Sequence, residues 1–226
     1  CQLFRFLEKE PPSETKLILN SFVLSVNSLS MKPSFLLIIL ILIAIPILLM
    51  SFTKARIEKQ KYRVVKKDKE FEIRFYPPAI FATTRSAAKS YRELGSSGFR
   101  KIAGYIFGNN ETSAKIAMTA PVHMDINEKG SSMSFVMPSE YSLDKLPRPA
   151  DTRVELHESP AVYMAAIEFS GYANDQKIKQ YADQLSQILI KKGIKTIGSP
   201  TYLGYNAPYE IIGRKNEVVI AIEWKE

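Results

Sequence analysis

The chain has 226 residues, of which 46% are hydrophobic, so it is long enough to form one sizeable core or two modest ones. Its single cysteine, Cys1, excludes an internal disulfide framework, a zinc ribbon or a thiol redox pair within the chain. The net charge of +8 is spread along the chain, and no basic stripe alternates with aromatic residues, so we expect no nucleic-acid partner.

Residues 35–52 form an uncharged, strongly apolar run that begins "FLLIILILIAIPILLM". As a helix it would span about 27 Å, close to the thickness of a hydrocarbon core. Helices of soluble proteins usually carry a polar face, and this run has none. The run therefore predicts one membrane-spanning helix in contact with the lipid bilayer, and a buried soluble helix is the alternative.

The residues around this run are typical of a signal anchor. Met31-Lys32 precedes it and Lys54 and Arg56 follow it, while no A-x-A cleavage pattern is present. We expect a single-pass membrane protein whose soluble domain lies on an undecided side, because the positive-inside rule and an N-terminal signal point in opposite directions. The predicted parts are a doubtful upstream segment (1–30), the anchor with its juxtamembrane segment (31–60) and a folded domain (61–226).

The folded domain opens with two predicted strands and a helix. "EFEIRFY" (70–76) alternates apolar and polar residues, as a half-buried strand does, and "AIFATTRSA" (79–87) predicts a second strand. Ser96 or Ser97 can cap a helix that Gly108 would end. The apolar face of this helix would consist of Phe99, Ile102, Ala103 and Ile106.

The later part of the domain repeats this order. "AVYMAAIEF" (161–169) predicts a strand, and Asn174 or Asp175 opens a second helix that Gly193 would end. The stretches at 209–213 and 217–224 then predict a hairpin.

Short internal similarities suggest that the domain is duplicated. "PPAIFATT" (77–84) resembles "SPAVYMAA" (159–166), and both predicted helices precede an Ala-Pro pair, at 120–121 and at 207–208. Two strand-helix-strand units that share one mostly antiparallel sheet would form an α+β domain. Because the matched stretches are short, chance similarity is the alternative.

The stretch "KIAMTAPVHM" (115–124) begins a predicted strand over 115–126 whose methionines share one face. Met118, Val122 and Met124 would lie on the apolar face, and His123 on the opposite, solvent-facing side. Pro121 requires an edge position or a bulge. The methionines either fill an irregular core or line an adaptable groove for a flat ligand.

The histidines do not form part of a recognisable catalytic motif. His157 alternates with apolar neighbours and falls on the polar face of its stretch. No Ser-His-Asp set, framed carboxylate pair or phosphate-binding loop is apparent, so we do not expect an enzyme.

Five stretches in this order resemble the SOUL haem-binding family. They are "FEIRFYPPAIFATT", "GFRKIAGYIFGNNE", "KIAMTAPV", "FVMPSEY" and "YLGYNAP", and the similarity runs from about Tyr62 to Trp224. The resemblance implies a distorted β-barrel built from two pseudo-symmetric halves with two helices. It also implies non-covalent binding of haem or a related porphyrin in an apolar cleft.

The chain departs from this family at a position suspected of binding the haem iron. Some members of the family have histidine within "E-I-R-H-Y", where this chain has Phe75, so an axial histidine is not expected at that position. Lysines 101 and 115 are the expected partners of the ligand's propionates. The complete set of expected ligand-binding residues is Phe99, Lys101, Ile102, Ile106, Lys115, Met118, Val122 and Met124.

The sequence therefore favours a membrane-anchored tetrapyrrole-binding protein that buffers, carries or senses its ligand, with no bound metal of its own. Three alternatives stay open. One is a binding module for other flat apolar molecules, like the multidrug-sensing effector domains of bacterial regulators. The others are an enzyme acting on tetrapyrroles and a protein-interaction domain without a ligand.

Overall fold

The computed structural model describes residues 41–42, 45, 57–126, 130–207, 209–210 and 212–226. The predicted segment 1–30 and nearly all of the predicted anchor lie outside these ranges. Among the residues described, no helix is both long and apolar enough to cross a bilayer. Residues 57–226 form one compact unit.

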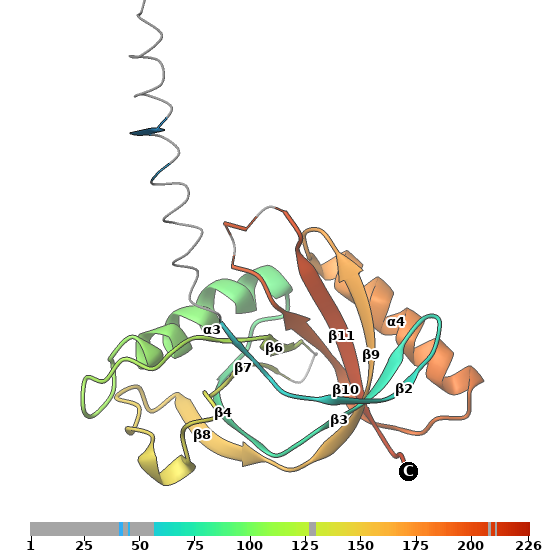
Figure 1. The fold of residues 1–226 in the computed structure, drawn as a ribbon, viewed down its shortest axis with the longest axis horizontal. Coiled ribbons are helices and arrows are strands. Elements are labelled where there is room, and N and C mark those ends of the chain that lie inside the picture. The colour runs from blue at the N-terminus through green and yellow to red at the C-terminus, as the bar shows by residue number, and fades with distance from the viewer. Residues whose placement is uncertain (1–40, 43–44, 46–56, 127–129, 208, 211) are drawn as a thin grey trace, which may run out of the picture. The chain divides into compact units, whose positions relative to one another are not determined.

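Strands account for most of the regular secondary structure in the unit, and Figure 1 shows them together with the two long helices. The strands are β1 (Glu58–Lys59), β2 (Arg63–Lys67), β3 (Glu72–Tyr76), β4 (Ala79–Ser86), β5 (Thr119–Ala120), β6 (Val122–Asp125), β7 (Ser131–Val136), β8 (Val154–Ser159), β9 (Val162–Ser170), β10 (Thr196–Gly204) and β11 (Lys215–Ile222). The helices are α3 (Tyr91–Ile106) and α4 (Asp175–Lys191), with a short 3-10 helix at Leu143–Lys145.

The strand order shows that the unit is duplicated. Nine strands form one antiparallel sheet in the order β2-β3-β9-β11-β10-β6-β7-β4-β8. Exchanging β3 with β8, β4 with β9, β6 with β10 and β7 with β11 gives the same order read from the opposite edge, with only β2 left without a counterpart in the sheet. With α3 matching α4, each half is a strand-strand-helix-strand-strand unit. The α+β class and the antiparallel sheet are confirmed.

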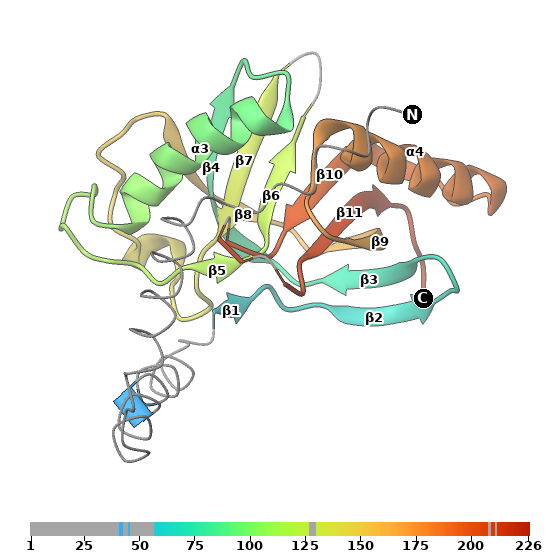
Figure 2. The ribbon, with the colours of Figure 1, turned by 90° about the horizontal axis from the view of Figure 1, so that it is seen from above.

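The sheet is a curled half-barrel, which is a coarser result than the predicted barrel. Its outer strands are β2 and β8, and within the described ranges these two do not pair with each other. Both helices lie on one side of the sheet, as the second view shows (Figure 2). Their apolar faces share a single buried core with the strands beneath them.

Helix α4 begins and ends where the sequence predicts. Asn174 is its N-cap, and its side-chain oxygen accepts a hydrogen bond from the Lys177 N–H at 2.8 Å. At the other end Gly193 has a φ of 65°, a left-handed conformation that glycine adopts without a steric penalty.

Helix α3 begins earlier than predicted. Its N-cap is Ser90, whose hydroxyl accepts from the Glu93 N–H at 3.2 Å, and the predicted caps lie inside the helix. Ser96 and Ser97 instead donate their hydroxyl hydrogens to the Glu93 carbonyl. A serine hydroxyl can bond either at a helix start or to the preceding turn of a helix, and the glutamate three residues after Ser90 is the local signal that marks Ser90 as the cap.

The predicted hairpin partner of β11 is wrong. β11 pairs with β10, and residues 209–213 belong to the connection between these strands. The Arg214 guanidinium donates to the carbonyls of Ala207 and Glu210, which folds the connection back on itself. The second Ala-Pro pair begins after β10 ends whereas the first precedes β6, so the two pairs are not structurally equivalent.

The predicted strand over 115–126 is also interrupted. Residues 115–118 are not strand, and the cis Ala120–Pro121 peptide separates β5 from β6. Proline has no N–H to give to the ladder, which explains why the strand breaks at this position.

Candidate ligand-binding site

Three of the expected ligand-binding residues lie deep in the core. Ile102, Ile106 and Met124 are 0%, 1% and 3% exposed. The end of the Met124 side chain lies 4.0 Å from where a side chain on Gly95 would begin, which shows how closely α3 sits on β6. A ligand on the surface would therefore reach these three residues only through the side chains that cover them.

A second group of expected residues lies at the margin of the core. Phe99 is half-buried, and its ring centroid is 5.6 Å from that of Phe135. Val122 on β6 is also half-buried, and its cross-strand neighbour on β7 is Phe135. Met118 is half-buried and packs on the same core. We call Phe99 and Val122 the α3–β6 face, because both contact the Phe135 position and remain partly open to solvent.

The structure separates Lys101 from this face. Residues two apart on an α-helix differ by about 200°, so Phe99 and Lys101 lie on opposite flanks of α3. The charge of Lys101 acts on Asp151, whose pKa falls to about 2 chiefly through hydrogen bonds from Arg153. Lys115 is exposed in the connection before β5.

Arg92 is a cation that the sequence analysis missed. It is exposed and lies seven residues before Phe99, so it shares the flank of α3 that carries the α3–β6 face. The heptad spacing was the available signal, but the predicted helix began after this residue.

The expected position of His123 is wrong. The imidazole is 8% exposed, its Nε2 lies 2.8 Å from the Gln60 side-chain oxygen, and its ring meets Phe81 edge-on at 5.1 Å. Burial lowers its pKa to about 4, although the charge of Glu217 opposes the shift. The period-two reasoning put His123 on the correct face, but β6 is an interior strand and other side chains cover that face.

The two remaining positions relevant to iron are near the surface. His157 is exposed, as expected, and its Nε2 lies 3.0 Å from the Thr83 hydroxyl. Phe75, which replaces the suspected ligand position, is half-buried against Tyr163 with ring centroids 5.2 Å apart. Among the residues that the structure describes, no three His, Cys, Asp or Glu side chains are placed to hold a metal ion.

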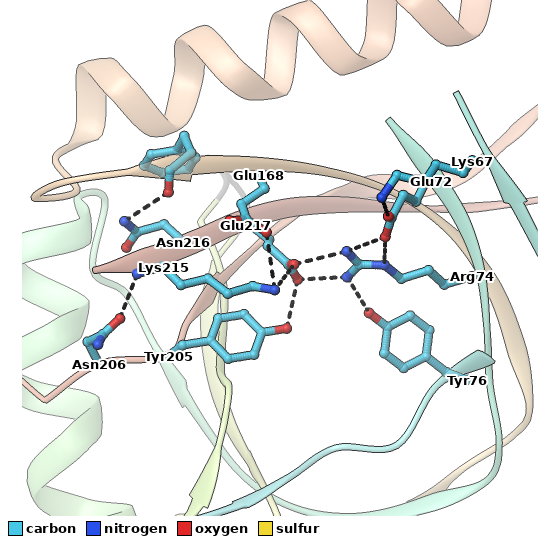
Figure 3. Close-up of polar contacts among 11 residues, drawn as sticks. Lys67, Glu72, Arg74, Tyr76, Glu168, Tyr205, Asn206, Lys215, Asn216 and Glu217 are labelled. Atoms are coloured by element: carbon cyan, nitrogen blue, oxygen red, sulfur yellow. Dashed lines mark hydrogen bonds and ion pairs between the residues drawn. The ribbon is translucent and has the colours of Figure 1, made fainter. Parts of the chain in front are cut away.

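The face of the sheet opposite the helices carries a buried ion pair (Figure 3). Arg74 of β3 donates to both carboxylate oxygens of Glu217 on β11, at 2.8 and 3.0 Å, and also to Glu72 at 2.8 Å. The side chains of Arg74 and Glu217 are 4% and 0% exposed. The alternation in "EIRFY" indicated a polar face there, but it contains no information on the partner strand.

Further partners complete the pairing of Glu217. Tyr205 donates its hydroxyl to Glu217 at 2.7 Å, and the Lys215 Nζ lies 2.9 Å from the same carboxylate. Burial alone would raise the pKa of Glu217, but the hydrogen bonds and charge of Arg74, with Tyr205 and Lys215, lower it. Both oxygens of this carboxylate are therefore engaged, and the network joins β3 and β11 to the residue that follows β10.

The chain matches one protein family over most of its length. The SOUL heme-binding protein family matches residues 57–221. This range includes both helices and all the strands, except for the last residue of β11. The chain belongs to the SOUL family. Heme-binding protein 2 of mouse is 32% identical over 158 residues, covering 66% of this chain and 76% of the relative. Heme-binding protein 1 of Xenopus laevis is 28% identical and is covered to 81%.

Solved structures share the fold at low identity. The C-terminal domain of EcmrR superposes with a TM-score of 0.52 at 12% identity, covering 72% of this chain and 98% of that one. A hydrolase from Listeria innocua gives a TM-score of 0.50 at 9% identity, covering 70% and 94%. These similarities concern the fold alone.

Proposed function

We propose that this SOUL domain binds haem or a related tetrapyrrole non-covalently and acts as a buffer, carrier or sensor, without catalysing a reaction. The relatives named for haem binding support the choice of ligand. The observation that carries the choice of site is the α3–β6 face, where Phe99 and Val122 meet around Phe135 and stay partly open.

The binding energy comes mainly from apolar contact. Covering about 400 Å² of apolar ligand surface gives on the order of 10 kcal/mol. The lost freedom of the ligand subtracts several kcal/mol, which leaves a Kd of roughly micromolar. Arg92, on the same flank as Phe99, is placed to attract a carboxylate of the ligand, as is exposed Lys115 if the ligand extends beyond β5.

Binding does not depend on an axial histidine in this proposal. The chain has two histidines, of which His123 is buried and held by Gln60 while His157 is on β8. Neither belongs to the α3–β6 face. The iron-free porphyrin should therefore bind about as well as the iron complex.

The proposed site includes half-buried Met118 as well as the α3–β6 face, and Met118→Asp tests this part of it. A carboxylate at this half-buried position would lose hydration against the apolar ring, so we expect porphyrin affinity to fall at least tenfold in an absorbance titration. Ala117→Asp is the matched control, because it adds the same charge one residue away at an exposed position. Equal affinities of the two variants, with native circular dichroism, would place the ligand elsewhere.

We also propose that residues 35–52 anchor the domain in a membrane by a single helix, with the side of the domain undecided. The support is the length and apolarity of the run. The full chain should stay in the membrane fraction through a carbonate wash, and its release into the supernatant would reject the anchor.

A further inference from the structure

The duplicated fold contains two equivalent grooves, one in each half. The first, of about 270 Å³, is lined by the start of β4 and the end of β7. The second, of about 760 Å³, is lined by the start of β9, the end of β11 and the connection between α4 and β10. The exchange that relates the two halves also relates these pairs of strand ends.

The chain itself crosses the first groove. Glu58, Gln60 and Lys61 contribute to its wall, and β1 pairs with β5 beside it. The Glu58 carboxylate accepts from the Ser139 N–H at 3.2 Å, and Gln60 reaches the buried His123. The N-terminal segment therefore forms part of the wall of the first groove, whereas the second groove is lined only by residues from Ala161 onward.

The second groove, which we call the β9–β11 groove, is amphipathic. Its apolar lining residues are Val162, Tyr163, Ile194, Ile197, Ile222 and Trp224. Its charged lining residues are three lysines, 192, 195 and 225, and one carboxylate, Glu223, so the lining carries a net charge of +2. An apolar floor with a cationic rim complements a flat apolar molecule that carries carboxylates.

The salt bridges of the rim are exchangeable. Lys192 pairs with Asp68 at 2.9 Å and Lys195 with Glu223 at 2.5 Å, in pairs whose lysine side chains are 42% and 72% exposed. Exposed ion pairs contribute little stability, so a ligand carboxylate can replace the partner at small cost. Neighbouring Lys66 lies over the Trp224 ring at 5.7 Å and adds a further cation.

We infer that the β9–β11 groove is a porphyrin-binding surface in its own right, distinct from the α3–β6 face. The ring would lie on Trp224 and Tyr163, and its carboxylates would meet the lysines of the rim. The choice of ligand rests on the proposed tetrapyrrole binding, but the groove is formed by different elements from α3 and β6.

The test is a stoichiometric titration of the full chain with protoporphyrin IX, against a protein-free blank of the same composition. Trp224→Ala should remove one equivalent of bound porphyrin. Lys225→Glu should weaken that equivalent about tenfold, because a rim cation becomes a repelling charge. Lys179→Glu is the matched control, since it reverses an exposed lysine of α4 that does not line the groove, and it should leave the titration unchanged.

The dimethyl ester of protoporphyrin IX adds a second measurement. Without carboxylates the porphyrin should lose its sensitivity to Lys225→Glu while still responding to Trp224→Ala. If porphyrin binds and neither variant changes the stoichiometry or affinity, the groove is not a site and the proposed function stands. If the unaltered chain binds no porphyrin, the proposed function itself fails.

Discussion

His123 is a buried imidazole in a polar contact with Gln60, and its neutrality has consequences for stability. Its pKa of about 4 in the folded chain is below the usual value of 6.5. Between these values the unfolded chain binds a proton that the folded chain does not, so stability present above pH 6.5 is lost as the pH falls toward 4.

We expect the free energy of unfolding to fall by up to about 3 kcal/mol across this window from the His123 contribution. Urea titrations at pH 7 and pH 5 measure the change. His123→Leu should flatten the dependence, since leucine has no proton to bind. A slope that is the same in both proteins would show that His123 titrates normally in the fold.

The buried ion pair between Arg74 and Glu217 leads to a second prediction, which concerns the free energy of unfolding. Arg74→Met leaves a carboxylate that is 0% exposed without its bidentate partner, and we expect a loss of about 3–5 kcal/mol in the free energy of unfolding. Lys67→Met removes only the pairing of a 78% exposed lysine with Glu72, so it should change stability by less than about 1 kcal/mol.

Adding Glu217→Leu to Arg74→Met should restore much of the lost stability, because the unpaired charge is removed. Acid weakens the same network. Since the pKa of Glu217 is lowered in the folded chain, its contribution is present above the unfolded value of about 4.5 and is lost as the pH falls below it. Additive losses in the double variant would indicate that the two residues act independently.

Residue-level prediction from the sequence succeeded for side-chain direction and failed for burial. Alternation placed Arg74 and His123 on polar faces, and both lie on the face opposite the helices. Whether that face meets water depends on segments far away in the chain, namely Gln60 for His123 and β11 for Arg74. A local pattern does not contain these partners.

The contact between α3 and the sheet depends on two glycines of the helix. A Cβ at Gly98 would lie 3.1 Å from the Met133 Cβ, whereas at Gly95 the nearest atom is the flexible end of Met124 at 4.0 Å. The two positions therefore differ in the space available, although both lie in the same helix.

Gly95→Ala should raise the free energy of unfolding by up to about 1 kcal/mol, which is the gain in helix propensity. Gly98→Ala should lower it by about 1 kcal/mol, because overpacking against a central strand exceeds that gain. Thermal unfolding of the two variants measures the difference, and equal stabilisation would mean that β7 moves freely away from the helix.

The first residues of the two helices were predicted with different success. Asn174 was identified because it stands directly before the helical apolar pattern, and the structure confirms it as the cap. Ser90 was missed because three serines near the start of α3 can all cap. The Ser90-x-x-Glu93 spacing was the local signal, because Ser90 accepts from the Glu93 N–H and the Glu93 carboxylate accepts from the Lys89 N–H. A tertiary contact adds to it, since Asp175 of α4 accepts a hydrogen bond from the Tyr91 N–H at 2.5 Å.

At the scale of the whole molecule, the duplication was predictable and the sheet order was not. The similarity between the stretches at 77–84 and 159–166 indicated two units, and these stretches enter the equivalent strands β4 and β9. However, β3 pairs with β9 and β8 pairs with β4, so each unit gives its first strand to the other. These pairings join residues far apart in the chain and leave no periodic signal.

The candidate site was predictable to a similar extent. The structure brings Phe99 and Val122 together around Phe135, places Ile102 and Met124 in the core, and separates Lys101 from Phe99. The family resemblance indicated the ligand, whereas the position of each side chain depends on how α3 rests on the sheet.

The most direct test of non-covalent tetrapyrrole binding without axial histidine is a parallel titration of residues 57–226 with hemin and protoporphyrin IX, followed at the Soret band. We predict saturable binding of both, with Kd values of about micromolar that agree within a few-fold. Saturable binding of neither would contradict the proposed function, and tight binding of hemin alone would show that the iron is coordinated by the protein.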